Sequence, residues 1–335
     1  MEYRILGKTG LKISRLGFGG IPIQKIDAEG TKRLMLQLKA EGINYIDTAR
    51  GYTVSEEYLG YALEGIRQDF IIATKSMSRT KEAMAADIET SLKNLRTDYI
   101  DLYQVHNATP EQLQQVMAPG GALEALQEAK AAGKIGHIGL TAHSMETFKM
   151  ALDLPWVETF MFPYNIVETQ AEKLIAECAK RNIGFIDMKP LAGGAIEDAT
   201  LALRYICAND AVTVVIPGMA EIKELEQNLA AVNDTAPITS EEKAAFLEVR
   251  NQLGTNFCRR CNYCQPCAAG INISGCFLFD GYLQRYGLGE WAKGRYDAMP
   301  KHAGDCIGCG ACEARCPYNL PIRDMLKKVA EHFGE

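Results

Sequence analysis

Eight cysteines in the last quarter of the 335-residue chain recur at short, regular intervals. They form two runs, Cys258-x-x-Cys261-x-x-Cys264-x-x-Cys267 and Cys306-x-x-Cys309-x-x-Cys312-x-x-x-Cys316. A thiolate at every third residue lets one tight loop bind three corners of a cubane cluster, and in two-cluster proteins the fourth cysteine of each run binds the other cluster. We therefore expect two 4Fe–4S clusters, one held by Cys258, Cys261, Cys264 and Cys316 and the other by Cys267, Cys306, Cys309 and Cys312.

The main alternative for these cysteines is a pair of structural zinc sites, because Cys-x-x-Cys pairs also bind zinc. Three cysteines at this spacing in each run, with Pro317 after the last, favour iron–sulfur clusters. The first run departs from the ferredoxin pattern, since only two residues separate its last two cysteines and Pro266 precedes Cys267. A ninth cysteine, Cys276, lies nearby; it is either a free buried thiol or a substitute for Cys267 as a ligand.

A second group of residues, Asp47, Tyr52, Lys75 and His106, could carry out acid–base chemistry. Asp47, Lys75 and His106 each end an apolar run, and Tyr52 follows Asp47 closely. Taken singly, the aspartate could cap a helix and the lysine or histidine could face solvent. Together they form a chemical unit: a lysine beside a tyrosine lowers the pKa of the phenol, an aspartate holds that lysine charged, and a histidine hydrogen-bonds a substrate oxygen. Such a tyrosine can protonate a developing alkoxide.

The elements that carry these residues alternate between short apolar runs and amphipathic segments up to about residue 235. Eight strand–helix units in this length predict parallel strands with helices outside, closed into an α/β (β/α)₈ TIM barrel whose C-terminal strand ends carry the chemistry. The alternative is an open doubly wound sheet, but no G-x-G-x-x-G follows the first strand. The predicted strands are 16–19, 43–47, 70–74, 99–105, 137–141, 157–162, 184–188 and 212–217, and the helical segments include 31–41, 81–95, 122–132, 169–181 and 221–231.

The barrel is expected to end near residue 255. Thr239-Ser240-Glu241-Glu242 supplies a cap and early acids for a helix that runs to about Leu253, and Gly254 then ends it. We therefore expect two domains: residues 1–255 form the barrel, and residues 256–335 form a small ferredoxin-like domain with the two clusters.

Composition narrows the class of protein. A net charge of −6 argues against general nucleic-acid binding, and the hydrophobic fraction of 47% is ordinary for a globular protein. No apolar run approaches the roughly 18 residues that would span a bilayer, and the N-terminus has no apolar signal segment. We expect a cytoplasmic protein without a membrane partner, in which thiols stay reduced and disulfides do not form.

Several motifs resemble the aldo-keto reductase superfamily. The most specific is Asp47-Thr48-Ala49-x-x-Tyr52-x-x-Ser55-Glu56-x-x-Leu59-Gly60, and the order and spacing of the four polar residues also match. The resemblance covers residues 1 to about 232, and the whole chain resembles the branch of the superfamily that is fused to a C-terminal ferredoxin-like domain with two 4Fe–4S clusters. Further matching segments are Tyr3-Arg4-x-Leu6-Gly7-x-Thr9-Gly10-Leu11, Tyr164-Asn165, Lys189-Pro190-Leu191, and Ile216-Pro217-Gly218 followed by Glu226-x-Asn228.

The resemblance implies NAD(P)H-dependent reduction of a carbonyl or aldehyde. It makes Tyr52 the general acid, Lys75 and Asp47 the residues that tune it, and His106 the residue that orients the carbonyl. Thr53 stands where glycine is more usual after the tyrosine. The implied cofactor-binding residues are Thr141, Asn165, Lys189, Pro217, Gly218 and Asn228.

The nicotinamide site departs from the family at several positions at once. The chain has Thr141-Ala142 where many members have Ser-Asn, Met161 where they have glutamine, and Met188 where they often have an aromatic residue. Glu221 and Glu224 stand where NADPH-specific members place basic residues for the 2′-phosphate. We therefore expect NADH to be favoured over NADPH, with the nicotinamide held by fewer contacts than usual.

These features lead to an oxidoreductase that reduces a small carbonyl substrate, with the clusters relaying electrons to or from a ferredoxin or flavodoxin. One alternative is a barrel reductase whose clusters are purely structural. Another is a non-catalytic redox-sensing partner subunit, which the intact Asp47, Tyr52, Lys75 and His106 disfavour. A flavin in the barrel would also suit one-electron donors. The sequence leaves open the substrate, the direction of electron flow and the oligomeric state.

Overall fold

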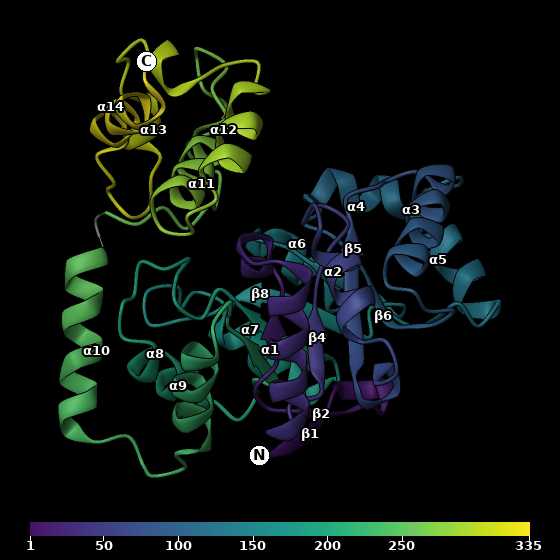
Figure 1. Ribbon diagram of the computed structural model, residues 1–335. Coiled ribbons are helices and arrows are strands. Elements are labelled where there is room, and N and C mark those ends of the chain that lie inside the picture. The colour runs from purple at the N-terminus through teal and green to yellow at the C-terminus, as the bar shows by residue number, and fades with distance from the viewer. Residues whose placement is uncertain (255) are drawn as a thin grey trace. The chain divides into compact units, whose positions relative to one another are not determined.

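The computed structural model describes residues 1–254 and 256–335, which form two compact units (Figure 1). Unit 1 contains Met1–Asn165, Thr169–Pro190 and Asp198–Ile238, and unit 2 contains Ile166–Glu168, Leu191–Glu197 and Thr239–Glu335. The expected domain boundary at residue 255 falls outside the described residues. None of the helices in the described ranges is long and apolar enough to cross a membrane.

Unit 1 is a barrel of eight parallel strands whose neighbours follow the order of the chain. The first and last strands approach each other through the parallel bridges Leu16–Val215 and Gly19–Gly218, and Gly17 N–H donates to Val215 O at 2.9 Å. The predicted α/β class and (β/α)₈ barrel are therefore confirmed. The strands are β3 (Phe18–Gly19), β4 (Tyr45–Asp47), β5 (Ile71–Ser76), β6 (Ile100–Val105), β7 (Ile135–Thr141), β8 (Thr159–Pro163), β9 (Gly184–Met188) and β10 (Val214–Ile216).

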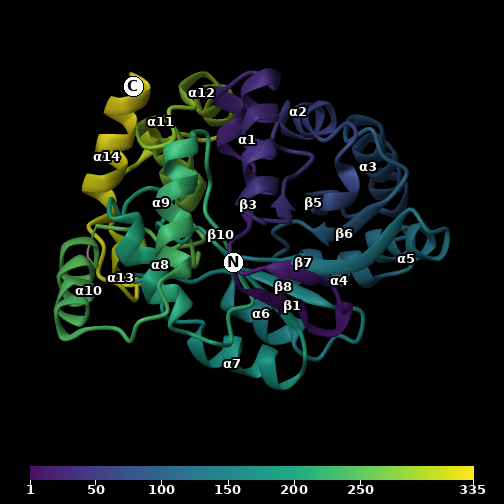
Figure 2. The same ribbon diagram turned by 60° about the horizontal axis from the view of Figure 1, so that its bottom comes forward.

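Helices cover the outside of this barrel, as Figure 2 shows for unit 1. Several begin where the sequence offers a side-chain cap: Asp27 accepts from Gly30 N–H at 2.7 Å, and Thr109 forms a capping box with Gln112. These caps satisfy backbone N–H groups that have no partner within the helix. The helices are α1 (Ala28–Ala40), α2 (Ser55–Ala62), α3 (Lys81–Asn94), α4 (Pro110–Met117), α5 (Ala122–Ala131), α6 (Met145–Ala151), α7 (Glu172–Lys180), α8 (Ala199–Cys207) and α9 (Ile222–Asn233).

An antiparallel hairpin of β1 (Tyr3–Ile5) and β2 (Lys12–Ser14) precedes the barrel strands. Leu6 and Ile13 are fully buried and pack in one cluster with barrel residues such as Tyr45. The hairpin is not among the predicted strands, because its short strands carry polar residues such as Arg4 and Lys12 and do not form an apolar run like those of the barrel strands. Leu6 and Ile13 thereby extend the cluster that the barrel strands form.

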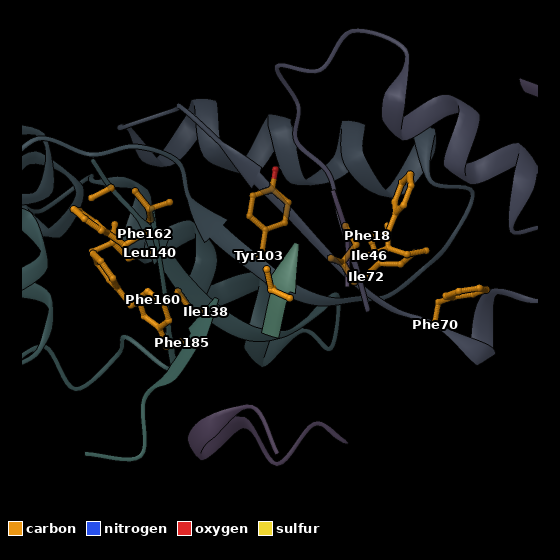
Figure 3. Packing of buried hydrophobic residues seen from close by; sticks show 14 of the residues in the cluster. Phe18, Ile46, Phe70, Ile72, Tyr103, Ile138, Leu140, Phe160, Phe162 and Phe185 are labelled. Atoms are coloured by element: carbon orange, nitrogen blue, oxygen red, sulfur yellow. The ribbon is translucent and has the colours of Figure 1, made fainter. Parts of the chain in front are cut away.

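The main core of unit 1 lies between the strands and the helices (Figure 3). Phe160 and Phe162 of β8 and Phe185 of β9 gather near Leu140, and Phe148 of α6 stacks on Phe160 with ring centres 4.1 Å apart. Aromatic side chains bury large apolar areas and dominate the energetics of such a core. This packing holds in place the strands that carry polar residues at their ends.

Unit 2 is mostly helical and has its own apolar core. Helix α10 begins at the predicted cap, where Thr239 forms a capping box with Glu242. Ile271, Leu320 and Ile322 lie in the core together with cysteines of both runs, so the two runs share one core. The helices are α10 (Ser240–Leu253), α11 (Ile273–Gln284), α12 (Gly289–Asp297), α13 (Ala311–Ala314) and α14 (Ile322–Phe333).

Gly60 in α2 lies against the end of α3, where backbone meets backbone. An added Cβ at Gly60 would lie 2.1 Å from Asn94 O, and backbone atoms cannot move away cheaply. We expect Gly60→Ala to lower the free energy of unfolding by about 1–3 kcal/mol through overpacking. Urea unfolding followed by circular dichroism measures this change.

Gly294→Ala in α12 is the control for this substitution. A methyl group at Gly294 meets no atom within 4 Å, so the change should raise the free energy of unfolding by about 0.4–1 kcal/mol. If Gly60→Ala were as stable as the parent protein, α2 and the end of α3 would have to separate at little cost.

Candidate active site

The C-terminal ends of three neighbouring strands bring the four predicted polar residues together. Asp47 is the last residue of β4, Lys75 lies near the end of β5, His106 directly follows β6, and Tyr52 lies in the loop between β4 and α2. The Lys75 ammonium forms a buried ion pair with Asp47 and lies 4.9 Å from the centre of the Tyr52 ring. The rings of Tyr52 and His106 meet edge to face with their centres 6.2 Å apart. All four side chains therefore occupy one site.

The ion pair of Asp47 and Lys75 is held on both sides. Lys75 Nζ also donates to Thr48 O at 2.8 Å, and Gln104 Nε2 donates to the second carboxylate oxygen of Asp47 at 3.3 Å. Both charged side chains are almost fully buried. Burial lowers the pKa of Lys75 and raises the pKa of Asp47, and the charge of each partner opposes the other's shift. The ammonium is therefore kept at one position beside Tyr52.

The loop that carries Tyr52 is tied to the barrel at several points. Arg50 N–H donates to Lys75 O at 3.0 Å, and the Arg50 guanidinium forms an ion pair with the buried Glu56 at 2.5 Å. Thr53 has a φ of 42°, in the left-handed region where a β-branched residue is strained. Glycine adopts this region without strain, which explains why it suits the position after the tyrosine.

Arg79 and Gln104 lie near His106 and are not among the site residues predicted from the sequence. The Arg79 guanidinium donates to the His106 carbonyl oxygen at 2.7 Å, and burial lowers the pKa of Arg79 to about 10. Gln104 donates to Asp47. Strand alternation could have revealed Gln104, because it lies two residues before His106 and so shares its face of the sheet. No local pattern marks Arg79, because only the fold brings its partner near.

The predicted cofactor-binding residues lie at the ends of later strands and on α9. Asn165 Nδ2 donates to Lys189 O at 3.0 Å, which joins the segments that follow β8 and β9. The hydroxyl of Thr141, at the end of β7, accepts from Asn107 N–H at 2.8 Å. Thr141 therefore also holds the backbone next to His106.

Pro217 and Gly218 lie where the barrel closes. Gly19 N–H donates to Pro217 O at 2.9 Å, and Gly218 pairs with Gly19 in a parallel bridge. Asn228 of α9 is only 4% exposed. The amide groups of Asn165 and Asn228 are buried, and each carries both donors and an acceptor for hydrogen bonds.

Glu221 and Glu224 stand at the start of α9. Glu224 Oε2 accepts from Ala220 N–H at 2.7 Å and from Glu221 N–H at 3.0 Å. A helix N-terminus attracts phosphate groups through such N–H donors. Because these donors are bonded to a carboxylate, an additional phosphate at this point would meet negative charge.

A cavity in unit 2 is lined by four cysteines, one from the first run and three from the second. They are Cys267, Cys306, Cys309 and Cys312, the set that crossed ligation assigns to one cluster. Cys309 is exposed and Cys312 is buried. The fold therefore brings the last cysteine of the first run to the second run.

The other four expected ligands also lie in one region. Burial raises the pKa of the Cys264 thiol to about 12, and the nearby Cys258 and Cys261 add to the shift. Burial also raises the pKa of Cys261, with a further contribution from Cys316. Neighbouring thiolates repel one another unless a bound cation compensates, so these residues fit a cationic metal cluster. Cys276 is fully buried in α11, where burial raises its pKa to about 12.

Comparison with known proteins identifies the family. Residues 15–200, more than half of the chain, match the Aldo/keto reductase family. The chain belongs to this family. Residues 257–321, which contain both cysteine runs, match the 4Fe-4S dicluster domain. The protein thus joins an aldo-keto reductase domain to a C-terminal iron–sulfur domain, as its sequence predicts.

Relatives of this aldo-keto reductase cover most of its barrel. L-galactose dehydrogenase from Arabidopsis thaliana is 28% identical over 307 residues, which cover 74% of this chain and 95% of that protein. The aldo-keto reductase YhdN from Bacillus subtilis is 34% identical over 201 residues, 54% of this chain and 59% of that protein. The holo form of aldo-keto reductase AKR11C1 from Bacillus halodurans superposes with a TM-score of 0.64 at 27% identity, covering 74% of this chain and 96% of that one. The chain is thus an oxidoreductase of a family that generally uses NAD(P)H.

Proposed function

We propose that this aldo-keto reductase reduces a small carbonyl or aldehyde to the alcohol, with Tyr52 as the general acid. The observation that supports the proposal most directly is the buried ion pair of Asp47 and Lys75, with its ammonium 4.9 Å from the centre of the Tyr52 ring. The reduction needs two electrons and two protons. A hydride from NAD(P)H supplies both electrons and one proton, and the Tyr52 hydroxyl supplies the other proton to the developing alkoxide.

The other residues of the site assist this proton transfer. The positive charge of Lys75 stabilises the phenolate that Tyr52 leaves behind. Asp47 keeps the lysine charged where burial opposes that charge. His106 meets Tyr52 edge to face, which places an imidazole beside the phenol, and we assign to it the hydrogen bond that orients the carbonyl oxygen. Arg79 fixes the backbone that positions His106.

NADH should bind more tightly than NADPH. Glu224 places a carboxylate on the N–H groups of Ala220 and Glu221, just before α9, and the exposed Glu221 adds a second negative charge. Two unit charges about 4 Å apart repel by about 1 kcal/mol in water and about 4 kcal/mol at an effective dielectric constant of about 20. NADPH should therefore bind at least several-fold more weakly in an anaerobic titration of the holoprotein.

Glu224→Gln is the matched variant for this titration. It keeps an oxygen that can accept from Ala220 N–H and removes the charge, so it should reduce the difference in affinity between NADH and NADPH. Equal affinities in the parent protein would refute the electrostatic argument. The residues that we assign to nucleotide binding are Thr141, Asn165, Lys189, Pro217, Gly218 and Asn228.

The second part of the proposal is that the eight cysteines hold two 4Fe–4S clusters, which supply one-electron transfer to the barrel chemistry. Because nicotinamide accepts single electrons poorly, direct coupling needs a flavin in the barrel or a substrate that tolerates a radical. A ferredoxin or flavodoxin in the cytoplasm would be the external electron carrier. The ligands are Cys258, Cys261, Cys264 and Cys316 for one cluster and Cys267, Cys306, Cys309 and Cys312 for the other.

Reduction of the clusters in the absence of nucleotide tests this relay. The anaerobic holoprotein is reduced with dithionite, freed of excess reductant, and mixed with candidate aldehydes or a flavin while the visible absorbance is followed. A relay predicts that an aldehyde reoxidises the clusters in the parent protein and does so far more slowly in Tyr52→Phe. Clusters that stay reduced with every acceptor, while NADH supports full turnover in the same preparation, would favour a structural role for them.

A further inference from the structure

We propose that Arg315 is a positioning residue that holds the two cysteine runs together so that the last cysteine of each run can bind the other run's cluster. Its side chain also places one positive charge beside both clusters. The proposal rests on the cluster ligation proposed above. It concerns how the ligands are held, and it is independent of the reaction in the barrel.

The guanidinium of Arg315 bonds the backbone of both runs. Its Nη2 donates to Cys264 O at 2.9 Å and to Pro266 O at 2.8 Å, and its Nη1 donates to Gln265 O at 3.1 Å. Its Nε donates to Ala311 O at 3.0 Å, within the second run. Three consecutive carbonyl oxygens of the first run therefore face one cation. The planar fork of an arginine can serve all of them, whereas the compact ammonium of a lysine cannot.

These hydrogen bonds lie where the proposed ligands cross. The three carbonyl groups lie between Cys264, assigned to one cluster, and Cys267, assigned to the other. Arg315 itself lies between Cys312 and Cys316, which are also assigned to different clusters. One side chain thus fixes the backbone that leads into both crossing ligands, Cys267 and Cys316.

The Arg315 side chain also lies beside both sets of ligands. The side chain lines the cavity that contains Cys267, Cys306, Cys309 and Cys312, and it bonds the carbonyl group of a residue assigned to the other cluster. A cluster gains one negative charge when it is reduced, and its potential depends on nearby charge and hydrogen bonds. A positive charge next to both clusters should therefore raise both reduction potentials.

Arg323 provides a matched comparison. It lines the same cavity as Arg315, and its guanidinium is paired with Glu313 of the second run at 2.8 Å. Its Nε also donates to that carboxylate at 2.9 Å. These bonds go to a side chain of the second run and not to the three carbonyl groups of the first run, so loss of Arg323 should leave both clusters in place.

The test compares Arg315→Gln, Arg315→Lys and Arg323→Gln after anaerobic purification. Iron and labile sulfide are measured, and the potential of each centre is obtained from a redox titration followed by electron paramagnetic resonance. Arg315→Gln should lose iron from both clusters, and its loaded fraction should show both potentials shifted to more negative values. Arg315→Lys should also lose iron, because it lacks the fork, but its loaded fraction should keep potentials near those of the parent. Arg323→Gln should keep both clusters.

Several outcomes would overturn the proposal. Arg315→Gln would contradict it by keeping all its iron with unchanged reduction potentials, or by losing only one of the two clusters. Arg323→Gln would contradict it by losing as much iron as Arg315→Gln, and Arg315→Lys by keeping both clusters fully occupied. If Arg315→Gln binds no iron at all, the loss in Arg315→Lys decides, with NADH binding as evidence that the barrel is folded. A parent protein that contains zinc and no sulfide would instead overturn the ligation itself, so the two failures are distinguishable.

Discussion

Tyr52→Phe should lower the rate of carbonyl reduction by about 10²–10⁴-fold, the contribution typical of a positioned general acid. The substitution removes the hydroxyl and leaves the ring, which lies edge to face with His106 and 4.9 Å from the Lys75 ammonium. NADH binding should stay nearly unchanged, because Tyr52 is not among the residues assigned to the nucleotide. Turnover of a panel of aldehydes at saturating NADH measures the rate, and a separate titration measures binding.

Tyr61→Phe is the matched control for this experiment. Tyr61 lies in the following helix, α2, and its hydroxyl donates to Glu29. Loss of that hydroxyl should leave turnover unchanged. If Tyr52→Phe turned over at the parent rate, the proton would have to come from another group. If Tyr61→Phe lowered the turnover rate as much as Tyr52→Phe, the loss would reflect a structural disturbance near α2 and not the removal of a general acid.

Cys309→Ser should remove one cluster and leave the other. The parent protein should contain about eight irons and as many sulfides per chain, and the variant about four of each. The reason is that Cys309 lines the cavity with Cys267, Cys306 and Cys312, whereas the four ligands assigned to the other cluster are unchanged. Iron and sulfide analysis of anaerobic protein, together with the visible spectrum, measures the loss.

The crossed ligand is tested by the pair Cys267→Ser and Cys276→Ser. Cys267 lines the cavity, whereas Cys276 is fully buried in α11. Cys267→Ser should therefore lose the same cluster as Cys309→Ser, and Cys276→Ser should keep both. The opposite pattern would make Cys276 the ligand. Stoichiometric zinc without sulfide in the parent protein would contradict the iron–sulfur assignment altogether.

Features with local signals were predictable from the sequence alone. The alternation of strands and helices predicted the (β/α)₈ barrel, and the strand predicted at 184–188 is observed as Gly184–Met188. The cysteine runs predicted the iron–sulfur domain in the same way, since a few neighbouring residues carry the whole pattern. The ends of other strands differ from prediction, because hydrogen bonds to a neighbouring strand decide where a strand stops: 16–19 was expected and Phe18–Gly19 is observed.

Tertiary structure decided which distant groups meet. The sequence placed Asp47, Lys75 and His106 at strand ends and Tyr52 shortly after Asp47, but strand register and core packing decide that Lys75 pairs with Asp47 and that Tyr52 meets His106. The same holds for the bonds of Arg79 to the His106 carbonyl and of Arg315 to the Cys264 carbonyl, which span 27 and 51 residues. No local periodicity encodes such contacts, because they exist only when separate elements have packed. The sequence thus determined which chemistry is present, and the packing decided which additional residues hold it in place.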